Sequence, residues 1–283
     1  MDLTSRHPET ILISGIHRSG TTLVCKLLSS LPDVVALNEP LDVSRLEGMT
    51  PQDILNFIDD FVAQNRRSLL EEGFAISRQV MGEIPDNMFT TNLTPEGLRQ
   101  TDAAHGTIRV NKPLSRHFTL ALKHNAAFAA CLRPLTAGFR CYATIRNPLA
   151  ALASWQTINV AAQQGHLPMA ENLQAQLKHD LAALKDVLDR QVHAINWFFE
   201  QYDAALPADR IIRYEELVSS HGRCLGTIVP AGATLDAPLE SRNLNPLYRQ
   251  DYINEIGKRL LARDGVYWKY YSKADVRALM SGG

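Results

Sequence analysis

Cysteine is scarce in this sequence. Four occur in 283 residues, and none belongs to a CxxC pair or to a Cys/His spacing typical of zinc sites. Three of the four fall in apolar surroundings, where a free cysteine behaves as a small hydrophobic residue. The four are Cys25, Cys131, Cys141 and Cys224. This pattern argues against a disulfide scaffold, so we expect reduced thiols, a cytoplasmic location and no structural metal.

Net charge and long apolar runs are also lacking. The formal net charge is −1 and the isoelectric point is about 6.8, so the chain has no overall attraction to nucleic acid or anionic membranes. No apolar run approaches the ~20 residues that span a bilayer. The N-terminus lacks the basic-then-apolar pattern of a signal peptide. We expect no nucleic-acid partner and no membrane span, and any anion site must be local.

The remaining composition predicts one globular domain over residues 1–283. Hydrophobic residues make up 45% of the chain and charged residues 21%, and no linker, repeat or low-complexity run divides it. Helical periodicity resumes from Thr50 but weakens over 66–106, where Gly and Pro punctuate polar sequence. We expect 41–106 to be either a substrate lid or a surface insertion without function. Residues 240–283 are expected to form a helical, aromatic tail.

The most informative stretch runs from Thr10 to Leu31. Thr10 to Ser14 is an apolar, β-branched run typical of a buried strand, and from Leu23 apolar residues recur at helical spacing. Between them lies Gly15-Ile-His-Arg-Ser-Gly-Thr-Thr22. A strand, a glycine-bounded loop and a helix N-terminus bring free backbone N–H groups together. The stretch therefore predicts an anion-binding site.

This loop has the outline of the nucleotide P-loop, G-x-x-x-x-G-K-[ST]. Gly15 and Gly20 take the glycine places, but Thr21 stands in the place of the lysine. Because that lysine normally reaches the β- and γ-phosphates, its absence argues against triphosphate chemistry. Arg18 and two hydroxyls are suited instead to holding one terminal phosphate. The alternative is an ordinary βα turn with a helix-capping serine.

The sequence Arg-Ser-Gly-Thr-Thr after a strand resembles a loop of known enzymes. It is similar to the 5′-phosphosulfate loop of sulfotransferases that use 3′-phosphoadenosine 5′-phosphosulfate (PAPS), above all the tyrosyl-protein sulfotransferases and related bacterial enzymes. The resemblance implies that Arg18, Ser19, Gly20, Thr21 and Thr22 bind the co-substrate. The tyrosyl-protein enzymes are anchored in Golgi membranes, and this sequence shows no such anchor.

A second strand, predicted over Asp33 to Leu37, ends at Asn38-Glu39-Pro40. The carboxyl ends of parallel strands meet at the ligand-binding edge of an open α/β sheet, which places Glu39 near the loop. Glu39 follows Arg18 by 21 residues, and this spacing resembles that of the proposed catalytic base of the tyrosyl-protein enzymes. A solvated loop carboxylate is the alternative.

Two lysines compete for the next motif. The predicted strand Phe118 to Leu122 ends at Lys123, which resembles the family's lysine at the end of a strand. Lys112-Pro113, after another predicted strand at 107–110, is the competing match. Lys123 stands 23 residues before Arg146, close to the family's spacing, whereas Lys112 stands 34 residues before it. We therefore expect Lys123 to be the catalytic lysine.

Arg146 follows the predicted strand Phe139 to Ile145 and begins the pattern R-N-P-x5-S, which ends at Ser154. Asn-Pro favours a helix start. The whole pattern resembles the family's motif for the ribose 3′-phosphate, held by the arginine and the serine together. The tyrosyl-protein enzymes carry a further arginine four residues after the serine, where this chain has Ile158.

The remaining chain is less legible. The apolar spacing predicts one long helix from Gln174 to Tyr202, followed by a strand at 210–213. The segment R-Y-E-E-L then resembles the family's R-Y-E-D-L, whose tyrosine, here Tyr214, approaches the nucleotide. Residues 241–243 stand where the family has a loop over the nucleotide. Four aromatic residues in the tail are expected to pack against the core: Tyr267, Trp268, Tyr270 and Tyr271.

Together these pieces imply an α/β fold with a P-loop-like parallel sheet and helices on both faces. The resemblance implies a sulfotransferase that moves a sulfuryl group from PAPS to an acceptor hydroxyl without a metal, leaving adenosine 3′,5′-bisphosphate. Glu39 would take the acceptor proton, while Arg18 and Lys123 stabilise the leaving oxygen. The acceptor (a sugar, lipid, phenol or peptide) is not specified, and a homodimer is left open. The alternatives are a small-molecule or nucleoside kinase and a catalytically idle nucleotide-binding protein.

Overall fold

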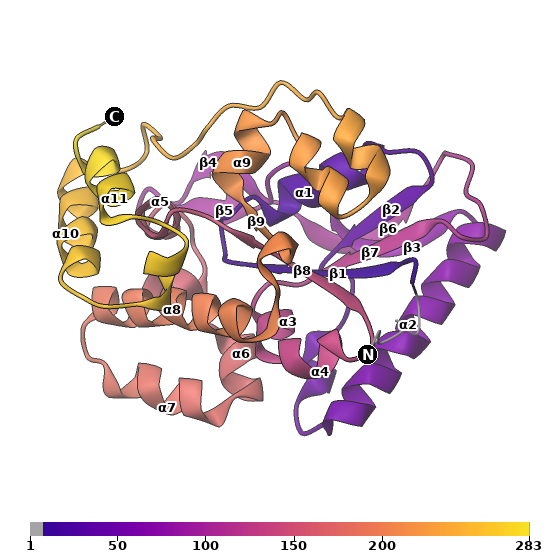
Figure 1. Ribbon diagram of the computed structural model, residues 1–283, viewed down its shortest axis with the longest axis horizontal. Coiled ribbons are helices and arrows are strands. Elements are labelled where there is room, and N and C mark those ends of the chain that lie inside the picture. Colours follow the sequence, from indigo (N-terminus) through magenta and orange to yellow (C-terminus); the bar gives the residue numbers. More distant parts are fainter. Residues whose placement is uncertain (1–7, 283) are drawn as a thin grey trace.

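The computed structural model describes residues 8–282, and within them a sheet of five parallel strands runs through the centre (Figure 1). The strand order is β2-β7-β1-β8-β9, and all neighbouring strands are parallel. The strands are β1 (Thr10–Gly15), β2 (Val34–Asn38), β7 (Thr119–Lys123), β8 (Arg140–Ile145) and β9 (Ile211–Arg213). Each lies within one residue of its sequence-predicted bounds, and the predicted α/β fold is confirmed.

Helices cover both faces of this sheet because successive strand residues point to opposite sides. Ile11 and Ile13 belong to a core shared with α1 (Thr21–Ser30) and α9 (Tyr214–Ser219). Leu12, between them, belongs to a larger core on the other face. The helices of that second core include α3 (Ala126–Ala130), α4 (Leu132–Thr136), α5 (Pro148–Trp155) and α8 (Val187–Ala205). Figure 1 shows the two layers above and below the sheet.

The carboxyl edge of the sheet collects the residues that the sequence singled out. β1 sits in the middle, with β7 on one side and β8 on the other, so the chain leaves β1 in one direction and later returns to its other side. Ligands of open α/β sheets bind at such a switch point, beyond the carboxyl ends of the strands. Arg18, Glu39, Lys123, Arg146 and Tyr214 all stand at or just after these strand ends.

The insertion is more regular than the sequence predicts. A long helix, α2, runs to Glu71, and two short antiparallel pairs follow it, so regular elements fill much of 66–106 although helical periodicity weakens there. The elements are α2 (Pro51–Glu71), β3 (Phe74–Gln79) paired with β6 (Ala104–Arg109), and β4 (Phe89–Leu93) paired with β5 (Arg99–Thr101). The strand expected at 107–110 therefore belongs to this insertion and not to the central sheet. Short strands whose partners lie far along the chain leave little local periodicity to detect.

The helix expected over Gln174 to Tyr202 is two helices, α7 (Ala175–Ala183) and α8. Leu184 is extended, with φ −87° and ψ 117°, and the Asp186 side chain caps α8 by accepting the N–H of Asp189. Arg190 also donates to the Leu184 carbonyl oxygen at 2.8 Å. An N-cap and a satisfied carbonyl end one helix and start the next without interrupting the apolar spacing. The helices α3 and α4 meet at Cys131, which ends the first and begins the second without a side-chain cap.

The C-terminal tail packs as expected. Tyr267 and Tyr271 are buried in the larger core, and Trp268 and Tyr270 are half-buried against it. The remaining helices are α6 (Pro168–Leu173), α10 (Gln250–Leu261) and α11 (Lys273–Met280). Short 3-10 turns lie at η1 (Val43–Leu46), η2 (Ala161–Gln164), η3 (Ala208–Arg210), η4 (Arg223–Thr227), η5 (Pro230–Thr234) and η6 (Val266–Lys269). All four cysteines are free, and three are buried, as the sequence predicts.

Candidate active site

The loop between β1 and α1 requires its two glycines. A Cβ on Gly15 would lie 2.3 Å from Cγ2 of Thr21 and 2.8 Å from the carbonyl oxygen of Thr144. Gly20 has a φ of +86° and directly precedes α1, and a Cβ there would lie 2.9 Å from the Tyr214 ring. The loop is therefore drawn tightly around the start of α1. The N–H groups of the first helical turn have no partner within the helix, and they are free to bind an anion.

The hydroxyl of Ser19 shapes this loop from inside. Its Oγ lies 2.7 Å from the carbonyl oxygen of Ile16 and 2.8 Å from that of Thr144, and the residue is fully buried. Ser19 therefore holds the loop against β8, and its expected role in co-substrate binding stays a prediction. Thr21 and Thr22, at the start of α1, line the cavity described below.

Arg18 extends from the loop toward α5. Its Nε donates to Oγ of Ser154 at 3.1 Å, and its Nη1 donates to Oδ1 of Asn87 at 2.8 Å. The guanidinium also lies over the Phe89 ring, 4.8 Å from the centroid. The two residues of the expected phosphosulfate and 3′-phosphate motifs, Arg18 and Ser154, are thus in direct contact.

Arg146 joins the loop, the strand end and the C-terminal segment. Its Nη1 donates to the Arg18 carbonyl oxygen and its Nε to Oδ1 of Asn243, both at 2.8 Å, and its Nη2 donates to the Arg242 carbonyl oxygen. The guanidinium lies over the Tyr214 ring at 4.5 Å, and the Tyr214 hydroxyl accepts the N–H of Arg242 at 2.9 Å. The segment around 241–243 therefore folds against the expected 3′-phosphate motif, although its sequence match is weak.

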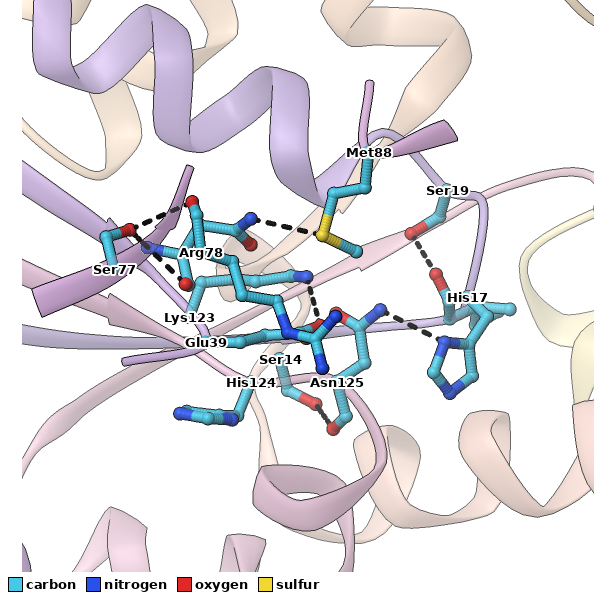
Figure 2. A network of polar contacts seen from close by, with 12 residues as sticks. Ser14, His17, Ser19, Glu39, Ser77, Arg78, Met88, Lys123, His124 and Asn125 are labelled. Atoms are coloured by element: carbon cyan, nitrogen blue, oxygen red, sulfur yellow. Dashed lines mark hydrogen bonds and ion pairs between the residues drawn. The ribbon is translucent and has the colours of Figure 1, made fainter. Parts of the chain in front are cut away.

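Glu39 carries an ion pair on each carboxylate oxygen (Figure 2). Nζ of Lys123 lies 2.8 Å from Oε1, and Nε of Arg78 lies 3.2 Å from Oε2. Burial opposes the charged form of Glu39, but the cations Lys123 and Arg78 lower its pKa to about 2. The carboxylate is therefore ionised at neutral pH. Since the side chain of Glu39 is 19% exposed and pairs with the wholly buried Lys123, the alternative of a solvated loop carboxylate at Glu39 is wrong.

The backbone holds Arg18 and Glu39 in an unusual conformation. Their φ angles are +69° and +48°, in the left-handed region that residues with a side chain rarely adopt. Such conformations persist only where the surrounding structure enforces them, and they cluster at functional sites. Both side chains point to the same cavity, so the strain occurs where the chain turns out of β1 and out of β2.

Two neutral histidines border the Glu39 network. Burial, assisted by Lys123, lowers the pKa of His17 to about 4 and that of His124 to about 3, although Glu39 opposes both shifts. Nε2 of His124 accepts the N–H of Leu41 at 3.0 Å, which fixes the proton on Nδ1 when the ring is neutral. The His17 ring packs edge-on against Trp155 and Phe198. Sequence reasoning assigned His124 no role, and the structure places it in the cavity wall.

Lys112 has a different environment from Lys123. Its Nζ donates to the carbonyl oxygens of Ser29 and Leu31, at 2.7 and 2.6 Å, at the carboxyl end of α1. A cation there satisfies terminal carbonyls and complements the helix dipole. The geometry therefore gives Lys112 a structural position and favours Lys123 for catalysis. The catalytic role itself stays a prediction.

One cavity of about 1330 Å³ joins these groups. The sequence-predicted residues in its lining are Arg18, Gly20, Thr21, Thr22, Glu39, Arg146 and Tyr214. Ser19, Lys123 and Ser154 are buried behind the wall. Lys123 and Ser154 each hydrogen-bond a side chain that does line the cavity, Glu39 and Arg18 respectively. Most of the expected residues thus line one cavity, and Lys123 and Ser154 each contact a side chain that lines it.

Sequence reasoning missed the side chains that the insertion contributes. Arg78 pairs with Glu39, Asn87 and Phe89 contact Arg18, and Arg99 lines the cavity nearby. None of the four belongs to a motif, and only their position in the folded chain brings them to the site. The insertion forms part of the cavity wall, while its expected action as a lid stays a prediction.

Comparisons with known proteins give little further information. No protein-family model and no curated protein sequence matches the chain. A solved structure that aligns with it is the sulfotransferase domain of the Synechococcus PCC 7002 olefin synthase, at 14% identity and a TM-score of 0.39, covering 100% of this chain and 96% of that one. A TM-score this low does not establish a common fold, so the description of this chain rests on its own geometry.

Across the part of the chain that the structure describes, no helix combines the length and apolar character needed to cross a membrane. Within residues 8–282, no three or more His, Cys, Asp or Glu side chains are grouped closely enough to hold a metal ion.

Proposed function

We propose that this protein is a sulfotransferase that uses PAPS and an acceptor hydroxyl. The proposal rests on the charged groups that line the cavity or stand directly behind its wall. Arginines stand at a glycine-bounded helix N-terminus, and a carboxylate–ammonium pair stands at neighbouring strand ends. The first group suits a strongly anionic ligand, and the second suits proton transfer and stabilisation of a developing oxyanion. The motif resemblance of the loop and of R-N-P-x5-S supports PAPS as that ligand.

The loop would hold the 5′-phosphosulfate, and Arg146 with Ser154 would hold the 3′-phosphate. A guanidinium has five N–H donors, and three bonds are found for Arg146, so donors remain for an oxyanion. The Ser154 hydroxyl accepts from Arg18 and keeps its own proton to donate. The residues present therefore fit a ligand with phosphates at two positions.

In the transfer step, the bond between sulfur and the bridging phosphate oxygen breaks, and a bond forms between sulfur and the acceptor oxygen. Glu39 takes the proton of the acceptor hydroxyl. Arg18, Lys123 and the loop N–H groups stabilise the negative charge on the leaving oxygen. Because arginine and lysine supply this positive charge, the proposal needs no divalent cation.

The pKa of Glu39 sets a condition on this step. At about 2 the carboxylate is a weak base, because Lys123 and Arg78 stabilise its charge despite its burial. If Lys123 turns toward the leaving oxygen, Glu39 loses its closest cation and its pKa rises. The same movement of one ammonium group would then strengthen the base and stabilise the leaving group, which couples the two halves of the reaction.

The acceptor belongs to the class of sugar, lipid, phenol or peptide hydroxyls. The cavity wall mixes charged and apolar side chains, including Leu41, Arg78, His124, Leu167 and Met169. This lining does not select among the four acceptor classes. A cytoplasmic enzyme with reduced cysteines belongs to the same proposal, with its state as monomer or homodimer left open.

Nucleotide choice tests the proposal. Calorimetry should show that adenosine 3′,5′-bisphosphate binds far more tightly than AMP or ATP–Mg²⁺. The change Arg146→Ala should remove most of this preference, since charge-assisted contacts contribute about 1.5–3 kcal/mol each. The exposed Arg116→Ala is the charge-matched control and should leave the preference intact. Equal affinities of the wild-type protein for AMP and the bisphosphate would falsify the assignment.

Chelation gives a second measurement on the same protein. Transfer from PAPS to any accepted hydroxyl should continue in excess EDTA. A complete loss that added Mg²⁺ restores would favour the kinase alternative.

A further inference from the structure

Arg99 is a cationic residue of the cavity to which no motif assigns a function. It begins β5 in the insertion, is 8% exposed, and lines the cavity together with Arg18 and Arg146. Its Nε is buried and has no hydrogen-bond partner among the residues that the structure describes. An unsatisfied buried N–H of a charged group is unfavourable, so this donor indicates a missing acceptor.

The side chain of Arg99 is held beside Ser154. Its backbone N–H donates to the Thr157 carbonyl oxygen at 2.9 Å, and its own carbonyl accepts the N–H of Asn159 at 3.0 Å. Its Nη2 donates to Oγ1 of Thr157 at 2.6 Å, and that hydroxyl donates to the Ser154 carbonyl oxygen at 2.8 Å. Arg99 is thus fixed at the carboxyl end of α5, one turn from the serine of the expected 3′-phosphate motif.

Three guanidinium groups gather here without a compensating carboxylate. None of the ion pairs found among residues 8–282 involves Arg18, Arg99 or Arg146. Burial, followed by the positive charge of Arg99, lowers the pKa of Arg18 to about 10. Asp86 and Glu240 line the same cavity but pair with none of the three. An external anion is the remaining way to balance this charge.

We propose that Arg99 binds the ribose 3′-phosphate of the nucleotide together with Arg146 and Ser154, so that the insertion completes the nucleotide site. The position beside Thr157 and Ser154 favours the 3′-phosphate over the phosphosulfate, which the loop at the start of α1 would bind. The isolated parallel bridge between Arg99 and Ile158 places the Arg99 backbone beside residue 158, and Nη2 of Arg99 reaches Oγ1 of Thr157. The inference rests on the proposed function, because it requires a nucleotide with a 3′-phosphate.

The competing explanation is that Arg99 only ties the insertion to α5. Its bonds to Thr157 would serve that purpose equally well. The two explanations differ in nucleotide selectivity. A tether changes stability or affects all nucleotides alike, whereas a phosphate ligand affects only nucleotides that carry the 3′-phosphate.

The test is a comparison of two nucleotides on matched variants. Calorimetry measures adenosine 3′,5′-bisphosphate and AMP on the wild-type protein, on Arg99→Gln and on Arg109→Gln. Arg109 is an exposed arginine of the same insertion, over the Phe74 ring, and controls for loss of one positive charge. We expect Arg99→Gln to lower the affinity for the bisphosphate about 10- to 100-fold and the affinity for AMP less than about threefold. Arg109→Gln should change neither by more than about twofold, and Arg99→Lys should recover part of the lost affinity.

The outcomes separate this inference from the proposed function. If the wild-type protein prefers the bisphosphate and Arg99→Gln keeps that preference, Arg99 is a tether and the proposed function stands. Equal weakening of both nucleotides by Arg99→Gln also overturns the inference, and a thermal melt shows whether lost folding is the reason. If the wild-type protein does not distinguish the two nucleotides, the proposed function fails and the assignment of Arg99 fails with it.

Discussion

Two charged clusters share the cavity, and they differ in how their charge is balanced. In one cluster, Glu39 lies between Lys123 and Arg78, so that a carboxylate has a cation on each oxygen. In the other cluster, Arg18, Arg99 and Arg146 bond to neutral oxygens, and within residues 8–282 they pair with no carboxylate. The first cluster is electrostatically satisfied within the chain. The second cluster is not.

This difference predicts that one cluster acts in the reaction and the other in ligand binding. Separating a buried ion pair is unfavourable because it leaves each charge uncompensated. The Glu39 cluster is therefore held in one geometry before any ligand arrives. Buried like charges repel, and an arriving anion relieves that repulsion, so the arginine cluster gains most when the ligand binds. We therefore expect changes at Glu39 and Lys123 to act mainly on turnover. Changes at the arginines should act mainly on affinity.

The largest expected effect is that of Glu39→Gln on turnover. The amide is close in shape to the carboxylate and can still accept from Lys123, but it cannot take the acceptor proton. Turnover should fall by about 10²–10⁴-fold, the usual contribution of a general base, with bisphosphate affinity nearly unchanged. Steady-state kinetics and calorimetry measure the two quantities, and the exposed Glu47→Gln is the matched control. Wild-type turnover in Glu39→Gln would place the base elsewhere, and His17 would be the first residue to examine.

The second comparison is Lys123→Met against Lys112→Met. Losing one donor to a developing oxyanion lowers turnover by roughly 10²–10³-fold, so Lys123→Met should be nearly inactive while it binds the bisphosphate with at most a few-fold loss. Lys112→Met removes the bonds to the end of α1 and should lower the melting temperature while keeping most activity. The opposite pattern, with Lys112→Met inactive and Lys123→Met active, would show that the spacing to Arg146 selected the wrong lysine.

The smallest expected effect is on stability at acidic pH. The folded pKa of Glu39, about 2, lies below its ordinary value of 4.5, so its ion pairs stabilise the fold above pH 4.5. This stabilisation is lost as the pH falls from 4.5 toward 2. Between pH 5 and pH 3, the unfolding free energy of the wild-type protein should fall by roughly 2 kcal/mol more than that of Glu39→Gln. Urea titrations at the two pH values measure the difference, and parallel losses in both proteins would show that Glu39 is not paired in solution.

The arginine cluster should not contribute to this pH dependence, because guanidinium groups stay protonated throughout the acidic range. Acidification should therefore weaken the ion pairs of Glu39 and leave the charges of the arginine cluster unchanged, so the two clusters are distinguished without any substitution. Affinity for the bisphosphate should still depend on pH, because the phosphates of the ligand become protonated. A stability measurement without ligand avoids this effect.

Local patterns in the sequence predict the parts of the site that lie on consecutive residues. The strand-loop-helix around Arg18 was predicted because an apolar run, two glycines and helical spacing follow one another directly. The end of β8 was predicted for the same reason, since Asn147 caps the Asn-Pro helix start by accepting the N–H of Leu149. Helix breaks were missed at 184–186, where the apolar spacing continues through the break.

The sequence by itself determined the strand ends at which Arg18, Glu39, Lys123 and Arg146 stand, because strands, glycine loops and helix caps depend on neighbours along the chain. Only the tertiary structure decided which charges are balanced. Lys123 meets Glu39 across 84 residues, and Arg99 meets Thr157 across 58. Electrostatic energies depend on distance and burial in space, which local sequence patterns do not encode. For that reason the pairing of Glu39 and the contribution of Arg99 to the arginine cluster became visible only in the folded chain.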